Sequence, residues 1–206
     1  QKTWPLCSIT ENSVLEYARR EVFQSIGSDL NARFFVGGGM FKTLLTGKSS
    51  NDIDIWTPSK EDHEILVQSL LEKGATEHEK LPYRRVFYLA NREIEIADNC
   101  VVSSLEDLLD KFDISISGIG VEFCRDGSQK ALIRDEVFVS LDKKEIQLLR
   151  PMGKTKYLLT TLERMRRYGE ELGFSVSNSD VEEVLEKMFL VDFGTDDWFL
   201  MKKVYE

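Results

Sequence analysis

Two aspartates separated by one apolar residue stand in the run NDIDIW, residues 51–56. Side chains of an extended segment alternate between two faces, so Asp52 and Asp54 share one face while Ile53 and Ile55 share the other. Two ionised carboxylates this close repel each other unless a cation lies between them, and Mg²⁺ prefers oxygen ligands of this kind. The spacing therefore predicts a magnesium site on this strand.

A run of three glycines, Gly37–Gly39, comes shortly before the aspartates and is followed by Lys42. Glycine lets backbone N–H groups approach a ligand without interference from a Cβ atom, and the helix expected over Phe41–Leu45 would turn its positive end to the same place. Phosphate and metal would then share one site. Glycine runs also make ordinary turns, and Asp-X-Asp pairs also occur on ordinary surfaces, so neither motif is decisive alone.

A third carboxylate is expected from the strand Arg92–Ala97, which should form a hairpin with Tyr83–Leu89. Glu93 and Glu95 share a face of that strand. We favour Glu95 because isoleucines flank it on both sides, so it should lie deeper, where a carboxylate needs a cation or a donor. Glu93 is the alternative third carboxylate. A further alternative is that both glutamates face solvent on an edge strand.

Composition narrows the class of protein. The chain has 206 residues, 42% hydrophobic and 31% charged, as expected of an ordinary globular protein. We see no apolar run of membrane-spanning length and no signal peptide, so we expect a cytoplasmic protein without a membrane partner. Its three cysteines lie far apart and are expected to be reduced thiols. A formal net charge of −9 argues against broad wrapping of nucleic acid.

Basic residues nevertheless gather in one C-terminal segment. Between Lys143 and Arg167 there are eight basic residues and two acidic ones. A helix is expected from about Lys154 to Leu172, and 100° per residue places Lys156, Arg164 and Arg167 together, opposite its apolar side. We therefore expect their replacement to affect folding little. A solvated helix face is the plainer interpretation of such a charge run.

The remaining pattern indicates an α+β chain. We expect a first helix beginning at Ser13, a helix from Ser59 to Gly74, a strand over residues 113–123, a short strand over Glu136–Ser140 and a last helix over Ser179–Leu190. The apolar residues of the tail predict a short docked helix there. Two domains are expected: residues 1–142 and a basic helical extension over residues 143–206.

Three stretches together resemble a known family. VGGGMFKTLLTGKSSNDIDIW resembles the signature of the DNA polymerase β nucleotidyltransferase superfamily, nearest to the head domain of tRNA CCA-adding enzymes and bacterial poly(A) polymerases. KFDISISG resembles the RRDFTINA motif of that branch, with Asp113 on its aspartate. ERMRRYGEELGF resembles its LRAFRFAARLGF helix, with Arg164 and Arg167 on its arginines. The resemblance implies a mixed β-sheet flanked by helices, with a short C-terminal helical extension.

The resemblance also implies an activity. It implies a metal-dependent nucleotidyltransferase that moves a nucleoside monophosphate from an NTP such as ATP to an acceptor hydroxyl, most simply an RNA 3′ end like that of tRNA. The alternatives are AMPylation of a protein hydroxyl, as in toxin–antitoxin relatives, and a non-catalytic nucleotide-binding module. In the implied site, carboxylates hold two Mg²⁺ ions, for which Mn²⁺ can substitute, and other residues bind the nucleotide. The metal-binding and catalytic residues are Asp52, Asp54 and Glu95; the nucleotide-binding residues are Gly37, Gly38, Gly39, Lys42, Asp113, Arg164 and Arg167.

The sequence also departs from the family's pattern. Phe41 and Lys42 replace the family's Arg-Asp after the glycines, so the contacts to the triphosphate must be partly rebuilt. We find no EDxxR helix of the kind that selects the base in that family. The base preference is therefore not carried over.

Overall fold

The computed structural model describes residues 9–47, 52–149 and 157–190, and these residues divide into two compact units. The first unit takes in the chain up to Leu109 together with Ile119–Ile133, and the second takes in Asp110–Gly118 together with the chain from Arg134 onward. The division differs from the expected boundary after residue 142. Residues 110–118 and 134–142 group with the C-terminal helices, because Ser115 bonds through its backbone N–H to Gln147 (2.7 Å) and its hydroxyl meets that of Ser140.

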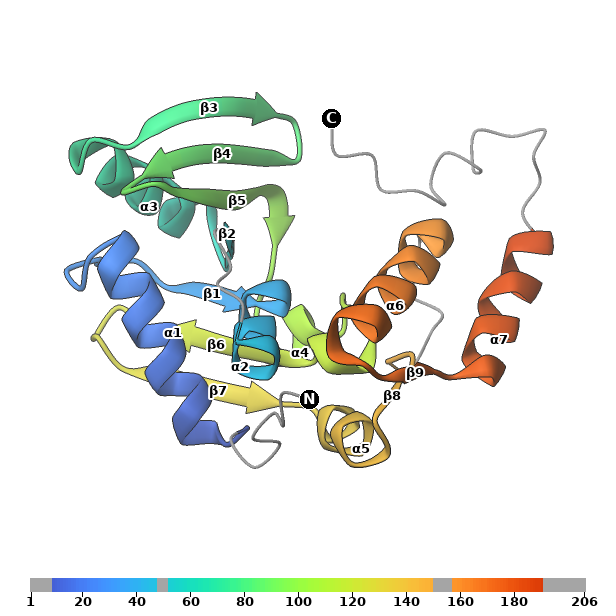
Figure 1. The fold of residues 1–206 in the computed structure, drawn as a ribbon. Coiled ribbons are helices and arrows are strands. Elements are labelled where there is room, and N and C mark those ends of the chain that lie inside the picture. The colour runs from blue at the N-terminus through green and yellow to red at the C-terminus, as the bar shows by residue number, and fades with distance from the viewer. Residues whose placement is uncertain (1–8, 48–51, 150–156, 191–206) are drawn as a thin grey trace. The chain divides into compact units, whose positions relative to one another are not determined.

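A seven-stranded mixed sheet forms the first unit, in the order β3-β4-β5-β2-β1-β6-β7 (Figure 1). Among the described strands of this sheet, β2 and β5 pair in parallel, and every other neighbouring pair is antiparallel. The strands are β1 Phe34–Gly37, β2 Asp52–Thr57, β3 Thr76–Leu81, β4 Arg84–Leu89, β5 Arg92–Val101, β6 Ile119–Phe123 and β7 Gln129–Ile133; the helices are α1 Glu11–Ser25, the 3₁₀ turn η1 Gly38–Phe41, α2 Lys42–Thr46, α3 Lys60–Glu72 and α4 Leu105–Leu109.

The apolar face of this sheet is covered by α1 and α3. Helix α1 packs on β6 and β7, and its Phe23 meets the ring of Phe123, which stacks on Phe34 at 4.8 Å. Helix α3 packs on β2 and β5, whose isoleucines are 0–1% exposed. Buried apolar side chains stabilise a fold by about 1.5–3 kcal/mol each, so this layer supplies much of the stability. The opposite face of β2 and β5 carries the charged residues Asp52, Asp54, Glu93 and Glu95.

Helix starts follow local capping chemistry. Ser59 caps α3 as expected, with its hydroxyl accepting from the backbone N–H of Asp62 at 3.1 Å. The first helix begins earlier than expected, because Thr10 and not Ser13 is its cap. Thr10 Oγ1 accepts from the N–H of Ser13 at 3.1 Å, while Ser13 Oγ accepts from the N–H of Thr10 at 2.9 Å. Thr10 and Ser13 thus form the reciprocal capping box.

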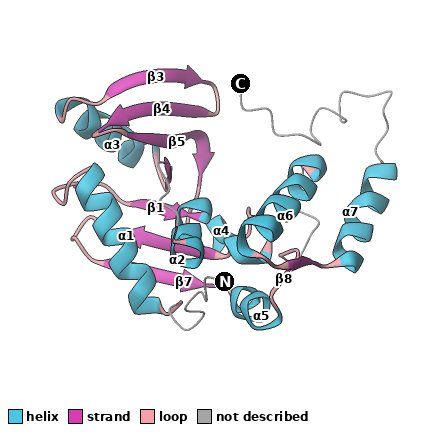
Figure 2. Cartoon of the chain, in the orientation of Figure 1, coloured by secondary structure: helices cyan, strands magenta, loops and turns pink. Residues whose placement is uncertain are grey.

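The second unit is mainly helical (Figure 2). Its small sheet pairs β8 with β9 in parallel, and Asp180 of the last helix accepts the N–H of Leu148 at 2.9 Å. Its elements are η2 Ser115–Ser117, α5 Asp135–Lys143, β8 Glu145–Ile146, α6 Leu158–Leu172, β9 Ser175–Val176 and α7 Asn178–Phe189.

Two expected strands are wrong. Residues 113–118 form η2 and its flanks, so the strand begins only at Ile119. The segment Glu136–Ser140 lies within helix α5, where Val137, Ser140 and Leu141 are buried at helical spacing. The β-branched composition suggested a strand, but a period of 3.6 fits the buried side. The expected tail helix lies outside the described residues. Among the helices of the described part of the chain, none combines the length and apolarity needed to cross a membrane.

Candidate active site

Four carboxylates lie in two rows on the polar face of β2 and β5. The parallel register pairs Asp52 with Glu93 and Asp54 with Glu95. Neighbouring strands lie about 4.8 Å apart, so each aspartate has a glutamate directly beside it. The intervening isoleucines of both strands are in register on the other, buried face. The alternation expected from the sequence therefore places both glutamates on the face that carries the two aspartates.

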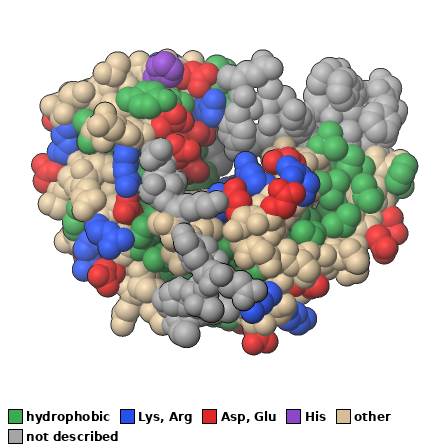
Figure 3. All heavy atoms as spheres, viewed as in Figure 1, with side chains coloured by type: hydrophobic (Ala, Val, Ile, Leu, Met, Phe, Trp, Pro, Cys, Tyr) green, Lys and Arg blue, Asp and Glu red, His purple; other side chains and the backbone are tan. Residues whose placement is uncertain are grey.

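Like charges in these rows act on one another. The pKa of Asp52 is raised, first by partial burial and then by the negative charge of Glu93. Tyr88 on β4 donates its hydroxyl to Glu93 Oε2 at 2.7 Å, and the pKa of that phenol is raised by the same bond. Acidic side chains gather over β4 and β5 in the space-filling view (Figure 3). Such a face favours a cation.

Arg84 on β4 already supplies one positive charge to this face. Its Nη1 donates to Glu95 Oε2 at 3.2 Å, and its Nη2 donates to Glu79 Oε2 at 2.9 Å. Burial opposes the charged form of Arg84, but these two carboxylates raise its pKa above the ordinary value. Glu95 is thus shared between a position beside Asp54 and an arginine on the next strand.

The residue types on this face fit a divalent metal. Carboxylate oxygens are the ligands that Mg²⁺ takes, and Asp52, Asp54 and Glu95 offer them from adjacent strands. Within the described ranges, no three His, Cys, Asp or Glu side chains already converge on one point. Glu95 is bonded to Arg84 in this arrangement. The donor set is therefore suitable in chemistry for a divalent metal.

The glycine run makes a tight turn between β1 and the helices that follow. Gly37 is extended and lies in register with Gly120, while Gly38 has φ of +70°, which residues with a Cβ rarely adopt. The turn continues as η1, which contacts β2, the strand of the two aspartates. Lys42 begins α2, which is only 5 residues long. A helix this short has little dipole, so it adds little of its own to the binding of an anion at this turn.

Asp113 in the second unit is held by its own side-chain partners. It is 8% exposed; its Oδ2 accepts from Thr161 Oγ1 at 2.7 Å and its Oδ1 from Arg164 Nη1 at 2.7 Å. Arg164 therefore does not lie opposite the buried side of α6 as expected. The reason is that Thr161, Met165 and Tyr168 are the buried positions, and Arg164 borders them.

Arg167 differs from Arg164. It is exposed, and its guanidinium lies 5.8 Å from the ring centre of Tyr168. The expectation that both arginines face outward is therefore wrong for Arg164 and holds for Arg167. Lys156, which was expected on the same face, lies outside the described residues.

Sequence reasoning overlooked Arg84, Glu79 and Tyr88. The hairpin turn at Ala90 and Asn91, both with positive φ, sets the register that places Tyr88 beside Glu93. That register, combined with alternation along β4, puts Arg84 and Tyr88 on the carboxylate face. The signal was present once the hairpin had been recognised. Strand β3, which carries Glu79, left no hydrophobic signal because none of its residues is buried.

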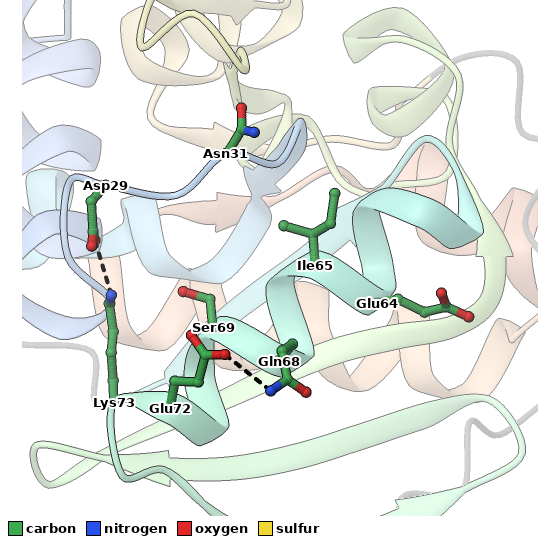
Figure 4. Close-up of a pocket in the computed structure, with 8 residues that line it drawn as sticks. All are labelled: Asp29, Asn31, Glu64, Ile65, Gln68, Ser69, Glu72 and Lys73. Carbon is green, nitrogen blue, oxygen red and sulfur yellow. Dashed lines mark hydrogen bonds and ion pairs between the residues drawn. The ribbon is translucent and has the colours of Figure 1, made fainter.

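A surface hollow lies away from this site. It is bounded by α3 and the segment before β1. Lys73 Nζ bonds to Asp29 Oδ1 at 2.9 Å between the two sides, and Gln68 Nε2 donates to Glu72 Oε1 at 3.0 Å within α3 (Figure 4). Helix α3 covers the apolar face of the sheet, whereas the four carboxylates are on the other face. The hollow is therefore separate from the candidate active site.

Solved structures with the same fold include proteins described as a tRNA-processing enzyme, a tRNA nucleotidyltransferase and a CCA-adding enzyme. The chain is similar to a tRNA-processing enzyme in an apo form (TM-score 0.62, 20% identity, 88% of this chain and 48% of that chain). It is also similar to a tRNA nucleotidyltransferase complexed with a primer tRNA and an incoming ATP analog (0.59, 19%, 77% and 47%), and to the Thermotoga maritima CCA-adding enzyme complexed with tRNA (0.57, 19%, 90% and 45%). The chain spans about half the length of these proteins. The nucleotidyltransferase fold predicted from the sequence is thereby confirmed.

Comparison with curated protein sequences gives no significant match. A match to one protein family extends over residues 12–144, well over half of the chain. The matched residues include the glycine turn, both aspartates and both glutamates of the candidate active site. The chain belongs to the Gabija anti-defense 2 family.

Proposed function

We propose that this protein is a metal-dependent nucleotidyltransferase that transfers a nucleoside monophosphate from an NTP to an acceptor hydroxyl. The observation that carries the proposal is the register of β2 and β5, which places Asp54 beside Glu95 and Asp52 beside Glu93 on one polar face. Such rows of like charge lower the stability of a sheet unless a ligand compensates them. The fold shared with tRNA nucleotidyltransferases supports the same activity.

The chain's own residues divide the work in this proposal. Asp52 and Asp54 would hold two divalent metal ions, and Glu95 would be the third carboxylate. Bound Mg²⁺ supplies positive charge to the triphosphate and lowers the pKa of the acceptor hydroxyl. The N–H groups of Gly37–Gly39 and the ammonium group of Lys42 bind phosphate oxygens. Asp113, Arg164 and Arg167 of the second unit stay as proposed contacts to the sugar, the phosphates or the acceptor.

An RNA 3′ end is the first candidate acceptor. Its support is that related folds have been solved with a primer tRNA and with tRNA. Arg167 is exposed and suits a phosphate contact. The formal net charge of −9 limits the RNA contact to a small basic area rather than a long groove.

A protein hydroxyl is the second candidate acceptor. The family's name sets its members against a defense system called Gabija, which favours a target belonging to that system. Transfer of a nucleotide to a protein side chain uses the same metal and phosphate chemistry and changes only the acceptor. A target protein would also suit an acidic chain better than a long RNA.

One labelling experiment tests the activity and separates the acceptors. The protein is incubated with Mg²⁺ and each of the four α-³²P-labelled NTPs, once with total RNA and once with purified Gabija proteins. We expect label in the RNA fraction; label in a protein band supports the second acceptor. Asp54→Asn is the control, because it removes a proposed metal ligand and should leave the fold unchanged. No transfer to either acceptor, or equal transfer by the variant, contradicts the proposal.

A further inference from the structure

Arg84 links two glutamates across three neighbouring strands of the carboxylate face. From β4 it reaches Glu79 on β3 at 2.9 Å and Glu95 on β5 at 3.2 Å, and its side chain is 12% exposed. An arginine stays charged at any physiological pH, and its planar fork can hold two carboxylates at once. Glu95 is the one of these two glutamates that lies in register with Asp54. The guanidinium therefore holds the carboxylate that the proposed metal site needs.

We propose that Arg84 competes with the divalent cation for Glu95 and that Glu79 retains the guanidinium when Glu95 turns to the metal. This inference rests on the proposed function. Glu95 contacts Arg84 through Oε2, and a carboxylate turning toward Asp54 loses that bond. Arg84 then stays bonded to Glu79, whose bond to Nη2 is the shorter of the two. Arg84 is in this sense a positioning residue that acts through Glu95.

Competition and an orienting role predict opposite changes in metal affinity when Arg84 is replaced. If Arg84 only oriented Glu95 for the metal, its loss would weaken metal binding. If Arg84 occupies Glu95, its loss frees the carboxylate and strengthens metal binding. Loss of Glu79 has the opposite effect, because Arg84 then has Glu95 as its remaining partner of the two.

The neighbouring arginine provides a matched control. Arg85 lies next in β4 and points to the other face of the strand, where its Nε donates to Glu77 Oε2 at 2.8 Å. Its guanidinium lies 5.3 Å from the ring centre of Phe87. Its side chain is 17% exposed, close to the 12% of Arg84, and Glu77 also belongs to β3. The pair Arg85–Glu77 thus has the same strands, charge and burial without contact to Glu95.

The experiment measures Mn²⁺ binding to the whole chain without nucleotide, by electron paramagnetic resonance of the free ion. We expect Arg84→Gln to bind Mn²⁺ about tenfold more tightly, which is the scale on which outer contacts tune metal sites. Arg85→Gln should bind as the unchanged protein does. Arg84→Lys keeps the charge and should gain less than Arg84→Gln. Equal or weaker binding by Arg84→Gln, or an equal gain by Arg85→Gln, overturns the inference.

Three further variants locate the effect. Adding Glu95→Gln to Arg84→Gln should remove the gain in affinity, and a gain that persists overturns the inference because the carboxylate is then not involved. Glu79→Gln should weaken Mn²⁺ binding several-fold, whereas Glu77→Gln should leave it unchanged. Glu79→Gln thus tests the competition for Glu95 even if Arg84→Gln fails to fold. Unchanged binding in Glu79→Gln contradicts the role given to Glu79.

The outcome separates the inference from the proposed function. Nucleotide transfer with no effect of Arg84 on Mn²⁺ affinity overturns the inference alone. A tenfold effect of Arg84 without any transfer to RNA or protein upholds the inference and overturns the proposed activity.

Discussion

The carboxylates of β2 and β5 and the carboxylate of Asp113 differ in the charges that lie beside them. In the first unit, each aspartate of β2 lies in register with a glutamate, so like charges stand side by side. In the second unit, Asp113 accepts hydrogen bonds from a threonine and an arginine on one helix. Arg84 and Tyr88 donate to the two glutamates of the first group, but each glutamate still has an aspartate in register beside it, and such rows of like charge favour a cation. We therefore propose ligand binding for the first group and a structural part for the second.

The structural part of Asp113 does not exclude a functional one. Each carboxylate oxygen has a second lone pair, so Asp113 can still accept a bond from a ribose hydroxyl. Its fixed orientation would favour such a contact. The expected role of Asp113 at the sugar therefore stays a prediction.

Asp54→Asn gives the largest expected effect. Nucleotide transfer should fall by at least about 100-fold, because a group that positions charge at the reacting phosphate is lost. The free energy of unfolding should stay the same or rise, since Asp54 lies beside Glu95 and not in the apolar layer. Label incorporation and urea unfolding measure the two quantities. If the variant loses activity because it is less stable, Asp54 has a structural part like that of Asp113, and the proposed difference between the two groups is wrong.

Arg164→Ala tests the structural group. Asp113 is 8% exposed and would lose its charged donor, so unfolding free energy should fall by about 2 kcal/mol. Arg167→Ala on the same helix is the control and should change stability by less than about 0.5 kcal/mol, because its side chain is exposed. Urea unfolding of both variants checks this. Equal losses would mean that Asp113 is not the cause.

Local patterns predicted the part of the site that depends on alternation. Asp52, Asp54 and the two glutamates share a face because strands have a period of two, and that rule needs no knowledge of distant contacts. Their pairing in register was not predictable, because it depends on how β2 lies between β1 and β5. The choice of the parallel pair is a property of the whole sheet.

Long-range contacts decided the elements that sequence patterns placed wrongly. Glu136–Ser140 has a strand-like composition, yet it is helical because Ser140 is buried against Ser115. Arg164 looked like a surface residue by helical projection, and a buried partner 51 positions away in the chain draws it inward. Strand β3 has no buried residue, so its existence follows from pairing with β4 and not from its own sequence.

Glu95→Gln compared with Glu93→Gln sharpens the contrast inside the acidic face. Glu95 is in register with Asp54, so its amide variant should raise the Mg²⁺ concentration for half-maximal transfer by about tenfold. Glu93 accepts the hydroxyl of Tyr88 at 2.7 Å, so its variant should have the smaller effect. Mg²⁺ titrations of transfer rate decide between them. If Glu93→Gln raises the requirement and Glu95→Gln does not, the third ligand is Glu93.

The smallest expected effect is a pH dependence of stability at Asp52. Partial burial and then the charge of Glu93 raise the pKa of Asp52 above 3.8, so the folded protein holds this proton more tightly than the unfolded chain does. The contribution of Asp52 to stability is therefore most favourable below its unfolded pKa and declines as pH rises through the raised value. Asp52→Asn removes that decline and should gain a few tenths of a kcal/mol at neutral pH, since the group is largely exposed.

Asp126 gives the matched control with the opposite sign. The hydroxyl and backbone N–H of Ser128 lower the pKa of Asp126, so this carboxylate favours the fold above its unfolded pKa of 3.8 and loses that effect as pH falls. Asp126→Asn should therefore be less stable than the unchanged protein at neutral pH and should approach it in acid. Urea unfolding at several pH values between about 3 and 7 measures both differences. If Asp52→Asn instead lost stability toward neutral pH, as Asp126→Asn is expected to do, Asp52 would be held by donors, and the case for a cation on this face would weaken.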